Sequence, residues 1–228
     1  MPKKIIKKRK IKFVNFLIFL LVLSVLVFGV YLILQIKVKN IIITGNTYIN
    51  DDTIIEKAGI KNYPKFLLTS SWKIEKKLKD YKYIKKVNMS KYPFVFKIDI
   101  EEAKVLFYDM NNNSYILNND KSIKEEENEY DFRVPRLINY VPDKKYKNFK
   151  ESMDLVNLDT ISKISDIEYK PNDYDKDRFL LYMDDGNAVY LTLTKFKMIN
   201  HYNEVLKQLE NHKGILYLDN GNHFKIME

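Results

Sequence analysis

The chain has 228 residues, enough for one or two modest domains. It contains no cysteine, which excludes disulfide bonds, thiol catalysis and cysteine-ligated metal sites. Its formal net charge is +9, but seven of its 39 basic residues and none of its 30 acidic residues lie within residues 1–12, which leaves 32 basic against 30 acidic residues in the remainder. A nucleic-acid-binding protein would carry its basic charge on the folded part, so we expect no nucleic-acid partner.

An uncharged stretch of 22 residues runs from Phe13 to Leu34. As a helix it would be about 33 Å long, which matches a hydrocarbon core of about 30 Å. A cleaved signal peptide would have a shorter apolar region and a cleavage site of small residues, whereas this run continues to Leu34-Gln35 without one. We therefore expect residues 13–35 to form a transmembrane helix that contacts the lipid bilayer through Phe13–Leu34.

The orientation of this helix follows from the flanking lysines and arginines. Residues 1–12 are strongly basic, and only Lys37 and Lys39 follow the helix closely. The positive-inside rule then makes residues 1–12 a cytoplasmic tail and places everything from about residue 36 outside the cytoplasm. The sequence thus predicts a single-pass type II protein of the cell membrane.

Directly after the anchor, Val38–Ile43 reads as a short strand that ends at the turn signal Gly45-Asn46. Asn50 and the two aspartates after it can cap a helix that runs through Ala58, and Gly59 would end that helix. The pattern over residues 72–81 predicts a second helix. Its apolar face would be formed by Trp72, Ile74 and Leu78.

Two further strands complete this region. Ile84–Met89 is strand-like, and Tyr92-Pro93 breaks the chain because proline restricts the preceding residue and cannot donate to a ladder. The following residues alternate with period two, which predicts one buried and one charged face. The buried face would contain Phe94, Phe96, Ile98 and Ile100. The order strand, helix, helix, strand, strand over residues 36–107 predicts a small α+β layer.

This region resembles the POTRA domain of the bacterial cell-division family FtsQ/DivIB. The resemblance is carried by the strand that ends at Gly45-Asn46, by Ala58-Gly59-Ile60, and by Lys91-Tyr92-Pro93 before the last strand. Members of that family often have an arginine and a proline after the acidic end of this strand. This chain has Glu101-Glu102-Ala103-Lys104 instead, so side-chain detail there is not carried over.

Residues 108–228 predict a second, strand-rich domain. Its first strands, Leu106–Tyr108 and Tyr115–Leu117, flank a turn of three asparagines, and a charged surface loop follows at residues 125–129. A helix is expected near Phe149–Leu158 and a strand at Ile164–Tyr169. Phe179–Met183 and Ala188–Leu193 would form a hairpin, since Asp185-Gly186 between them suits a primed turn.

The end of the chain predicts one helix and two strands. An apolar stripe indicates an amphipathic helix from Phe196 to about His212. The strand Ile215–Leu218 follows, then a turn at Asn220-Gly221, and a last strand that alternates through Phe224 and Ile226. This series is similar to the β-domain of FtsQ/DivIB. The expected fold class is therefore α+β, with an N-terminal transmembrane helix, a POTRA-like domain (β-α-α-β-β) and a mostly antiparallel β-domain with flanking helices.

No motif of a hydrolase, metalloprotease or nucleotide-binding protein occurs in the sequence. Asp173, Asp175 and Asp177 imitate the start of a calcium loop, but Arg178 stands where the loop needs glycine and Asp184 where it needs glutamate. His201 and His212 would lie about 16 Å apart on one helix, too far to share an ion. We therefore predict no catalytic residue, metal, cofactor or small-molecule substrate, although carboxylates are too numerous for an acid pair to be excluded by counting.

The family resemblance implies a non-catalytic scaffold at the division septum. Such a protein would bind the single-pass proteins FtsL and FtsB/DivIC and connect them to septal peptidoglycan synthases. A partner segment would add a strand to the open edge of the last strand. The residues assigned to this contact are Tyr217, Asp219, Asn222, His223, Phe224, Lys225 and Ile226. Without the resemblance, the same strand reads as an ordinary edge on which Lys225 discourages aggregation.

Two other classes of protein remain as alternatives. A membrane-anchored extracytoplasmic cell-wall enzyme would need a nucleophile or an acid/base pair in a cleft. A POTRA-type chaperone or translocation protein usually has tandem repeats or a following β-barrel, and the sequence shows neither.

Overall fold

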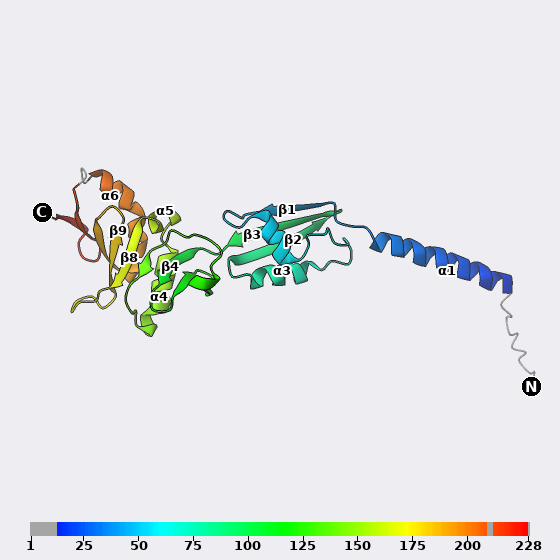
Figure 1. The fold of residues 1–228 in the computed structure, drawn as a ribbon, viewed down its shortest axis with the longest axis horizontal. Helices are drawn as coiled ribbons and strands as arrows, with labels where there is room; N and C mark the ends of the chain where they lie inside the picture. The colour runs from blue at the N-terminus through cyan, green and yellow to red at the C-terminus, as the bar shows by residue number, and fades with distance from the viewer. Residues whose placement is uncertain (1–12, 209–211, 228) are drawn as a thin grey trace, which may run out of the picture. The chain divides into compact units, whose positions relative to one another are not determined.

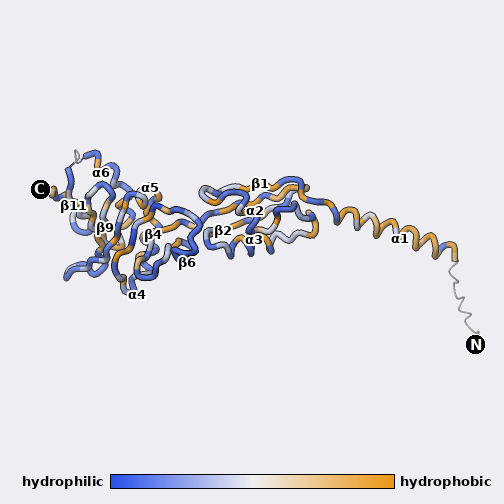
Figure 2. The backbone as a smooth tube through the Cα atoms, viewed as in Figure 1, coloured by the Kyte–Doolittle hydropathy of each residue, from blue (hydrophilic) through white to orange (hydrophobic). Residues whose placement is uncertain are grey.

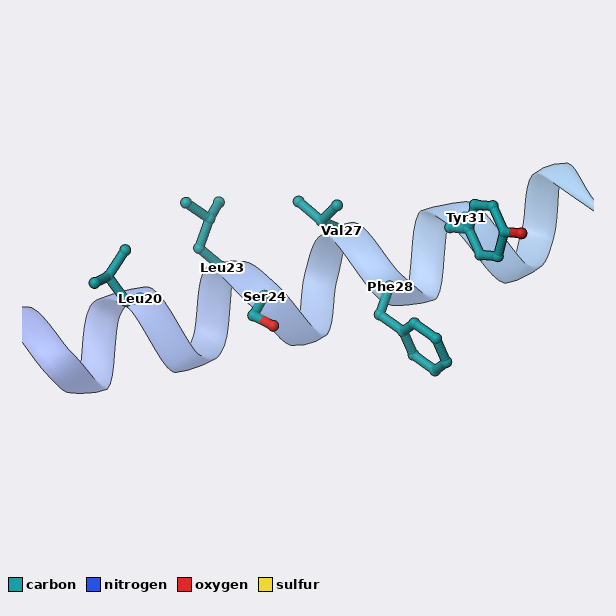
Figure 3. A pocket seen from close by; sticks show the side chains of 6 residues that line it. All are labelled: Leu20, Leu23, Ser24, Val27, Phe28 and Tyr31. Atoms are coloured by element: carbon teal, nitrogen blue, oxygen red, sulfur yellow. The ribbon is translucent and has the colours of Figure 1, made fainter.

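The structure, a computed structural model, describes residues 13–208 and 212–227. Helix α1 (Phe13–Leu34) takes up the whole uncharged stretch, is long and apolar enough to cross a membrane, and has no buried residue. It is almost uniformly hydrophobic (Figure 2). Side chains such as Leu23, Phe28 and Tyr31 point away from its axis (Figure 3) and are exposed. The helix predicted for Phe13–Leu34 is confirmed, and the predicted tail, residues 1–12, lies outside the described residues.

The chain divides into two compact units. Among the described residues, the first comprises residues 13–78 and 87–99, and the second comprises residues 79–86, 100–208 and 212–227. The chain therefore crosses from one unit to the other three times, after residues 78, 86 and 99, rather than at one linker.

The region after α1 has the predicted element order (Figure 1). Its elements are β1 (Asn40–Thr44), α2 (Asp51–Ala58), α3 (Ser71–Asp80), β2 (Ile84–Tyr92) and β3 (Val95–Glu102). The three strands form a sheet in the order β1-β3-β2, and β1 runs parallel to β3 with Asn40 opposite Val95. The β-α-α-β-β prediction is confirmed.

Local chemistry explains the bounds of α2. The Asn50 side chain accepts a hydrogen bond from the Thr53 backbone N–H at 2.8 Å, which caps the first turn. Gly59 ends the helix in the left-handed region, with φ +73°. In β3 the alternation buries Phe96 and Ile98, as expected.

Two details of this region differ from the predictions. Phe94 lies in the turn before β3 with φ +63° and is half-buried, because the chain reverses at Pro93-Phe94 before the strand begins. Trp72 is 65% exposed, while Ile74 and Leu78 are buried. The reason is the helical period: residues four apart share a face, whereas residues two apart point to nearly opposite sides.

The second unit contains a nine-stranded sheet in the order β12-β11-β10-β9-β8-β7-β4-β5-β6. Its first strands are β4 (Val105–Asp109), β5 (Ser114–Leu117), β6 (Ser122–Lys124), β7 (Arg136–Leu137) and β8 (Ile164–Tyr169). The remaining strands are β9 (Arg178–Met183), β10 (Ala188–Thr192), β11 (Gly214–Tyr217) and β12 (His223–Ile226). Most neighbours are antiparallel, as predicted, but β4–β7, β7–β8 and β10–β11 are parallel.

Helices α4 (Asp143–Asp154) and α5 (Leu158–Ile161) contribute Phe149 and Ile161 to the core of this unit, which is rich in aromatic side chains. The short 3₁₀ turn η1 (Glu125–Glu127) has no buried residue. The fully buried rings of Phe149 and Phe179 stack with centroids 4.7 Å apart, and Phe196 meets Phe179 edge-on at 5.4 Å. Helix α4 begins at Asp143, which lies in its first turn, and thus starts six residues before the predicted helix, which was expected near Phe149.

The helix predicted from Phe196 to about His212 is wrong in type over its first part. A 3₁₀ helix, η2 (Leu193–His201), comes first and α6 (Tyr202–Gln208) follows. The buried residues recur every third position, a spacing that the three-residue turn of a 3₁₀ helix keeps on one face. These residues are Leu193, Phe196, Ile199 and Tyr202. Residues 209–211 lie outside the described residues.

Candidate partner-binding edge

Strand β12 is the terminal strand of the nine-stranded sheet. It pairs antiparallel with β11, with Leu216 opposite Phe224 and Tyr217 opposite His223. The connecting turn contains Gly221 (φ +91°) and Asn222 (φ +44°), which occupy the left-handed region that a tight reversal requires. Within residues 13–208 and 212–227, no strand pairs with the other side of β12.

The hydrogen-bond alternation fixes which backbone groups face outward. The Met227 N–H donates to the Lys213 carbonyl at 2.9 Å, so this pair is of the hydrogen-bonded kind. Such pairs alternate along an antiparallel ladder. Lys225 therefore turns its backbone polar groups toward β11. Phe224 and Ile226 turn their N–H and C=O groups toward the open edge.

Gly214 at the start of β11 allows β12 to lie close to it. A Cβ at this position would meet the Lys225 carbonyl oxygen, and it would lie 2.6 Å from Cζ of the Phe224 ring. The Gly214 N–H also donates to Oδ1 of the buried Asn187 at 2.9 Å. Glycine at residue 214 thus anchors the edge to the β9–β10 hairpin without pushing β12 away.

One face of the β11–β12 pair carries an apolar cleft of about 430 Å³. The half-buried Phe224 ring and Leu216 line it from the sheet. Met198 of η2 and Val205 of α6 line it from the helical side. The cleft reaches the turn before β12, since Asn222 also lines it.

The opposite face carries a row of three stacked rings and one guanidinium group, which together cross four strands. The Arg178 guanidinium of β9 lies 3.5 Å from the centroid of the Tyr190 ring. Tyr190 stacks on Tyr217 at 5.2 Å, and Tyr217 stacks on His223 at 4.6 Å with an interplanar angle of 6°. The row orients the exposed His223 side chain at the edge.

Asp219 is bonded to other residues of its own domain. Its side chain is 7% exposed and accepts a hydrogen bond from Arg178 Nε at 2.5 Å. Lys195 Nζ donates to the Asp219 carbonyl at 3.0 Å. Asp219 and Arg178 border a polar cleft of about 540 Å³, next to the fully exposed Tyr174.

The structure brings the seven assigned residues together on β11, β12 and their turn. Asn222, His223, Lys225 and Ile226 are exposed, Phe224 and Tyr217 are half-buried, and Asp219 faces inward. Sequence reasoning did not find Arg178, Tyr190, Met198 or Val205, which complete both faces. Local sequence patterns do not identify these residues. The edge strand β12 pairs with β11, and β11 reaches its neighbour β10 only through a crossover connection of more than twenty residues.

The family of FtsQ-type POTRA domains matches residues 36–103. The chain is 32% identical over 225 residues to the cell division protein DivIB of Bacillus subtilis, covering 96% of this chain and 83% of that protein. The chain belongs to the DivIB family. DivIB of Brevibacillus brevis is 30% identical, with 89% and 80% of the two chains covered.

Among solved structures, the major extracytoplasmic domain of the trans isomer of DivIB from Geobacillus stearothermophilus is similar at 22% identity. The similarity covers 48% of this chain and 96% of that domain, with a TM-score of 0.39. The DivIB membership and helix α1 together identify a membrane-anchored protein associated with cell division.

Proposed function

We propose that this DivIB-family chain is a non-catalytic scaffold of the bacterial division machinery that binds FtsL-like and FtsB/DivIC-like proteins by strand addition at β12. It would connect them to septal peptidoglycan synthesis. Its N-terminus would lie in the cytoplasm and both folded regions outside, at the division septum. The open edge of β12 carries this proposal.

The edge offers what strand addition needs. The backbone N–H and C=O groups of Phe224 and Ile226 face away from β11, ready to continue the ladder. The two faces then differ in chemistry. A partner strand would meet the apolar cleft beside Phe224 on one face, and His223 and Lys225 on the other. Backbone bonds would supply affinity, and these alternate positions would supply specificity.

Asp219 acts in this proposal as a positioning residue. Its ion pair with Arg178 and the bond from Lys195 fix the end of β11 before the turn. We expect the partner strand to contact the exposed residues Asn222, His223, Lys225 and Ile226. It would also contact the accessible parts of Phe224 and Tyr217.

The decisive experiment separates the backbone of the edge from its side chains. Ile226→Pro removes an outward N–H donor but no bond to β11, and proline is tolerated where the N–H of an edge strand faces solvent. Ile226→Ala keeps the N–H and loses the side chain, which is 53% exposed. We expect the proline variant to lose association with membrane-reconstituted FtsL- and FtsB-like partners in a pull-down, and the alanine variant to retain most of it.

Thermal unfolding by circular dichroism provides the control for folding. Both variants should unfold near the temperature of the unmodified chain, since neither breaks the β11–β12 ladder. Retained association by a folded Ile226→Pro chain would refute the assignment of β12.

The non-catalytic part of the proposal is supported by the names of the relatives, which are those of division proteins. Two carboxyl groups also have a pKa shift opposite to that of a general acid, whose pKa is raised. Hydrogen bonds from Lys86 and Lys85 lower the pKa of Glu101. The Lys150 ammonium lowers the pKa of Asp120 in the same way. No observation favours the cell-wall enzyme.

A further inference from the structure

The loop between α2 and α3 is hydrogen-bonded to the residues that directly follow α1. The Phe66 N–H donates to the Ile36 carbonyl at 2.8 Å, and the Val38 N–H donates to the Pro64 carbonyl at 3.0 Å. Ile36 is itself bonded to the helix end, through its N–H to the Ile33 carbonyl at 3.3 Å. The loop is therefore attached to the end of the span by backbone bonds.

Chain length keeps this loop at the membrane surface whatever the orientation of the folded region. Ile36 is two residues beyond Leu34, the last residue of α1. An extended chain covers at most about 3.6 Å per residue, so Ile36 lies within about 7 Å of the end of the span. Phe66, bonded to Ile36, must lie near the same boundary.

The tip of the loop is rigid and apolar. The Thr69 N–H and hydroxyl both donate to the Lys65 carbonyl, at 3.1 and 2.7 Å, which closes a tight turn. Lys91 Nζ donates to the carbonyl oxygens of Phe66 and Thr69 and fixes the turn from the side. Two consecutive leucines at the tip, Leu67 and Leu68, are 51% and 59% exposed.

The flanking residues have the composition of a membrane interface. Tyr63 and Trp72 are 46% and 65% exposed on either side of the leucines, and such amphipathic rings are enriched at the level of lipid headgroups. No acidic residue occurs between Lys57 and Ile74. Exposed lysines flank the leucines in sequence at Lys61 and Lys73, and Lys37 and Lys39 are exposed next to Ile36 and Val38, which are bonded to the loop.

We propose that residues 63–72, the interfacial segment, lie in the headgroup layer of the bilayer that α1 spans. Leu67 and Leu68 would reach the acyl boundary, Tyr63 and Trp72 would lie among the headgroups, and the lysines would face anionic lipid. The contact would hold the POTRA-type region against the membrane surface. This inference needs α1 in a bilayer but does not need a partner at β12.

Trp72 is the only tryptophan in the chain and reports on this contact directly. The full chain would be reconstituted into phosphatidylglycerol vesicles whose lipids carry bromine on the upper acyl chain. We expect Trp72 emission to be quenched by these lipids and to be shielded from iodide in the water. Replacing phosphatidylglycerol with brominated phosphatidylcholine should reduce the quenching, because the lysines then lose their anionic partners.

Matched variants separate insertion from mere proximity to the membrane. Leu67→Glu with Leu68→Glu should abolish the lipid quenching while α1 keeps the chain on the vesicles in a flotation assay. Leu155→Glu with Leu158→Glu changes two leucines of the other unit that are 57% and 64% exposed. This control should leave the quenching unchanged.

Two results would overturn the inference. One is an unmodified chain that floats with vesicles while its tryptophan is quenched by iodide and not by brominated lipid, which would assign the patch to a protein partner. The other is quenching that survives the double glutamate substitution at Leu67 and Leu68. Pull-down of partners through β12 is read separately, so failure here and failure of the scaffold function are distinguishable.

Discussion

The pair of Arg178 and Asp219 shows how one buried contact shapes the candidate edge. Their side chains are 13% and 7% exposed and lie 2.5 Å apart, with the guanidinium over the Tyr190 ring. Neither charge has much access to water, so each depends on the other. The end of β11, and with it the turn into β12, is positioned by this pair.

Arg178→Met should destabilise the second unit by about 3–5 kcal/mol, because it leaves the Asp219 carboxylate buried and unpaired. Urea unfolding followed by far-UV circular dichroism measures the change. Combining Arg178→Met with Asp219→Asn should recover part of the loss, since the uncompensated charge is removed. A single variant that is as stable as the unmodified chain would contradict the structural role assigned to the pair.

At the level of residues, the sequence identified only one member of this pair. Asp219 follows a predicted strand and precedes Asn220-Gly221, so its position at a turn could be predicted. Arg178 lies 41 residues earlier in the chain, and only the order of the strands in the sheet brings it there. Trp72 differs from its prediction for another reason: it is apolar, but two residues before the buried Ile74 it lies on the exposed side of α3.

At the level of elements, the segment after η1 is hydrogen-bonded to the hydroxyl groups of Tyr81 and Tyr83 within the second unit. Tyr83 donates to Asn128 Oδ1 at 2.9 Å and accepts from the Glu129 N–H at 2.9 Å. Tyr81 donates to Glu129 Oε2 at 2.7 Å. Edge-on contact between the Tyr83 and Tyr130 rings, 4.8 Å apart, completes the packing.

This arrangement predicts a loss of stability at alkaline pH. Burial raises the pKa of Tyr83 and of Tyr81 above the ordinary value, since both hydroxyls are held neutral in the fold. The unfolded chain then releases these protons first, at a pKa of about 10. Their contribution is complete below that pH and is lost progressively as the pH rises from it toward the higher pKa of the folded state.

Guanidinium unfolding at about pH 8 and about pH 11, on either side of the tyrosine pKa, measures this loss. Tyr83→Phe should be less stable at the lower pH and should lose less on going to the higher one. An equal pH dependence in both chains would show that Tyr83 is not responsible.

The elements themselves were largely predictable where the pattern is local. The capped helix α2, the strand β3 and the β9–β10 hairpin follow from caps, alternation and turn residues close in sequence. The helix expected from Phe196 became η2 and α6, because an apolar stripe alone does not distinguish a repeat of three from one of 3.6. The short elements β6 and α5 carry too few residues for a period to be visible.

At the level of the whole molecule, the proposed orientation in the membrane rests on the basic residues among residues 1–12. Replacing the seven basic residues of residues 1–12 with glutamine should send a fraction of chains into the membrane in the opposite orientation, because the positive-inside bias is removed. A reporter fused after residue 228, active on only one side of the membrane, measures that fraction. Glutamine at Lys37 and Lys39 serves as the control and should keep the original orientation.

Strand β7 has a mechanical consequence. In the described sheet, β7 consists of Arg136 and Leu137 alone, and its two short ladders are the sole strand pairing between β4–β6 and β8–β12. Arg136 reinforces the join through an ion pair to Asp166 at 2.7 Å, and the buried Leu137 packs beneath it. A protein tethered to a bilayer and pulled through β12 would carry load across this narrow join. Under tension this two-residue ladder would have to break together with the contacts of Phe149 to Phe107 and Phe179, which join the same two groups of strands through the core.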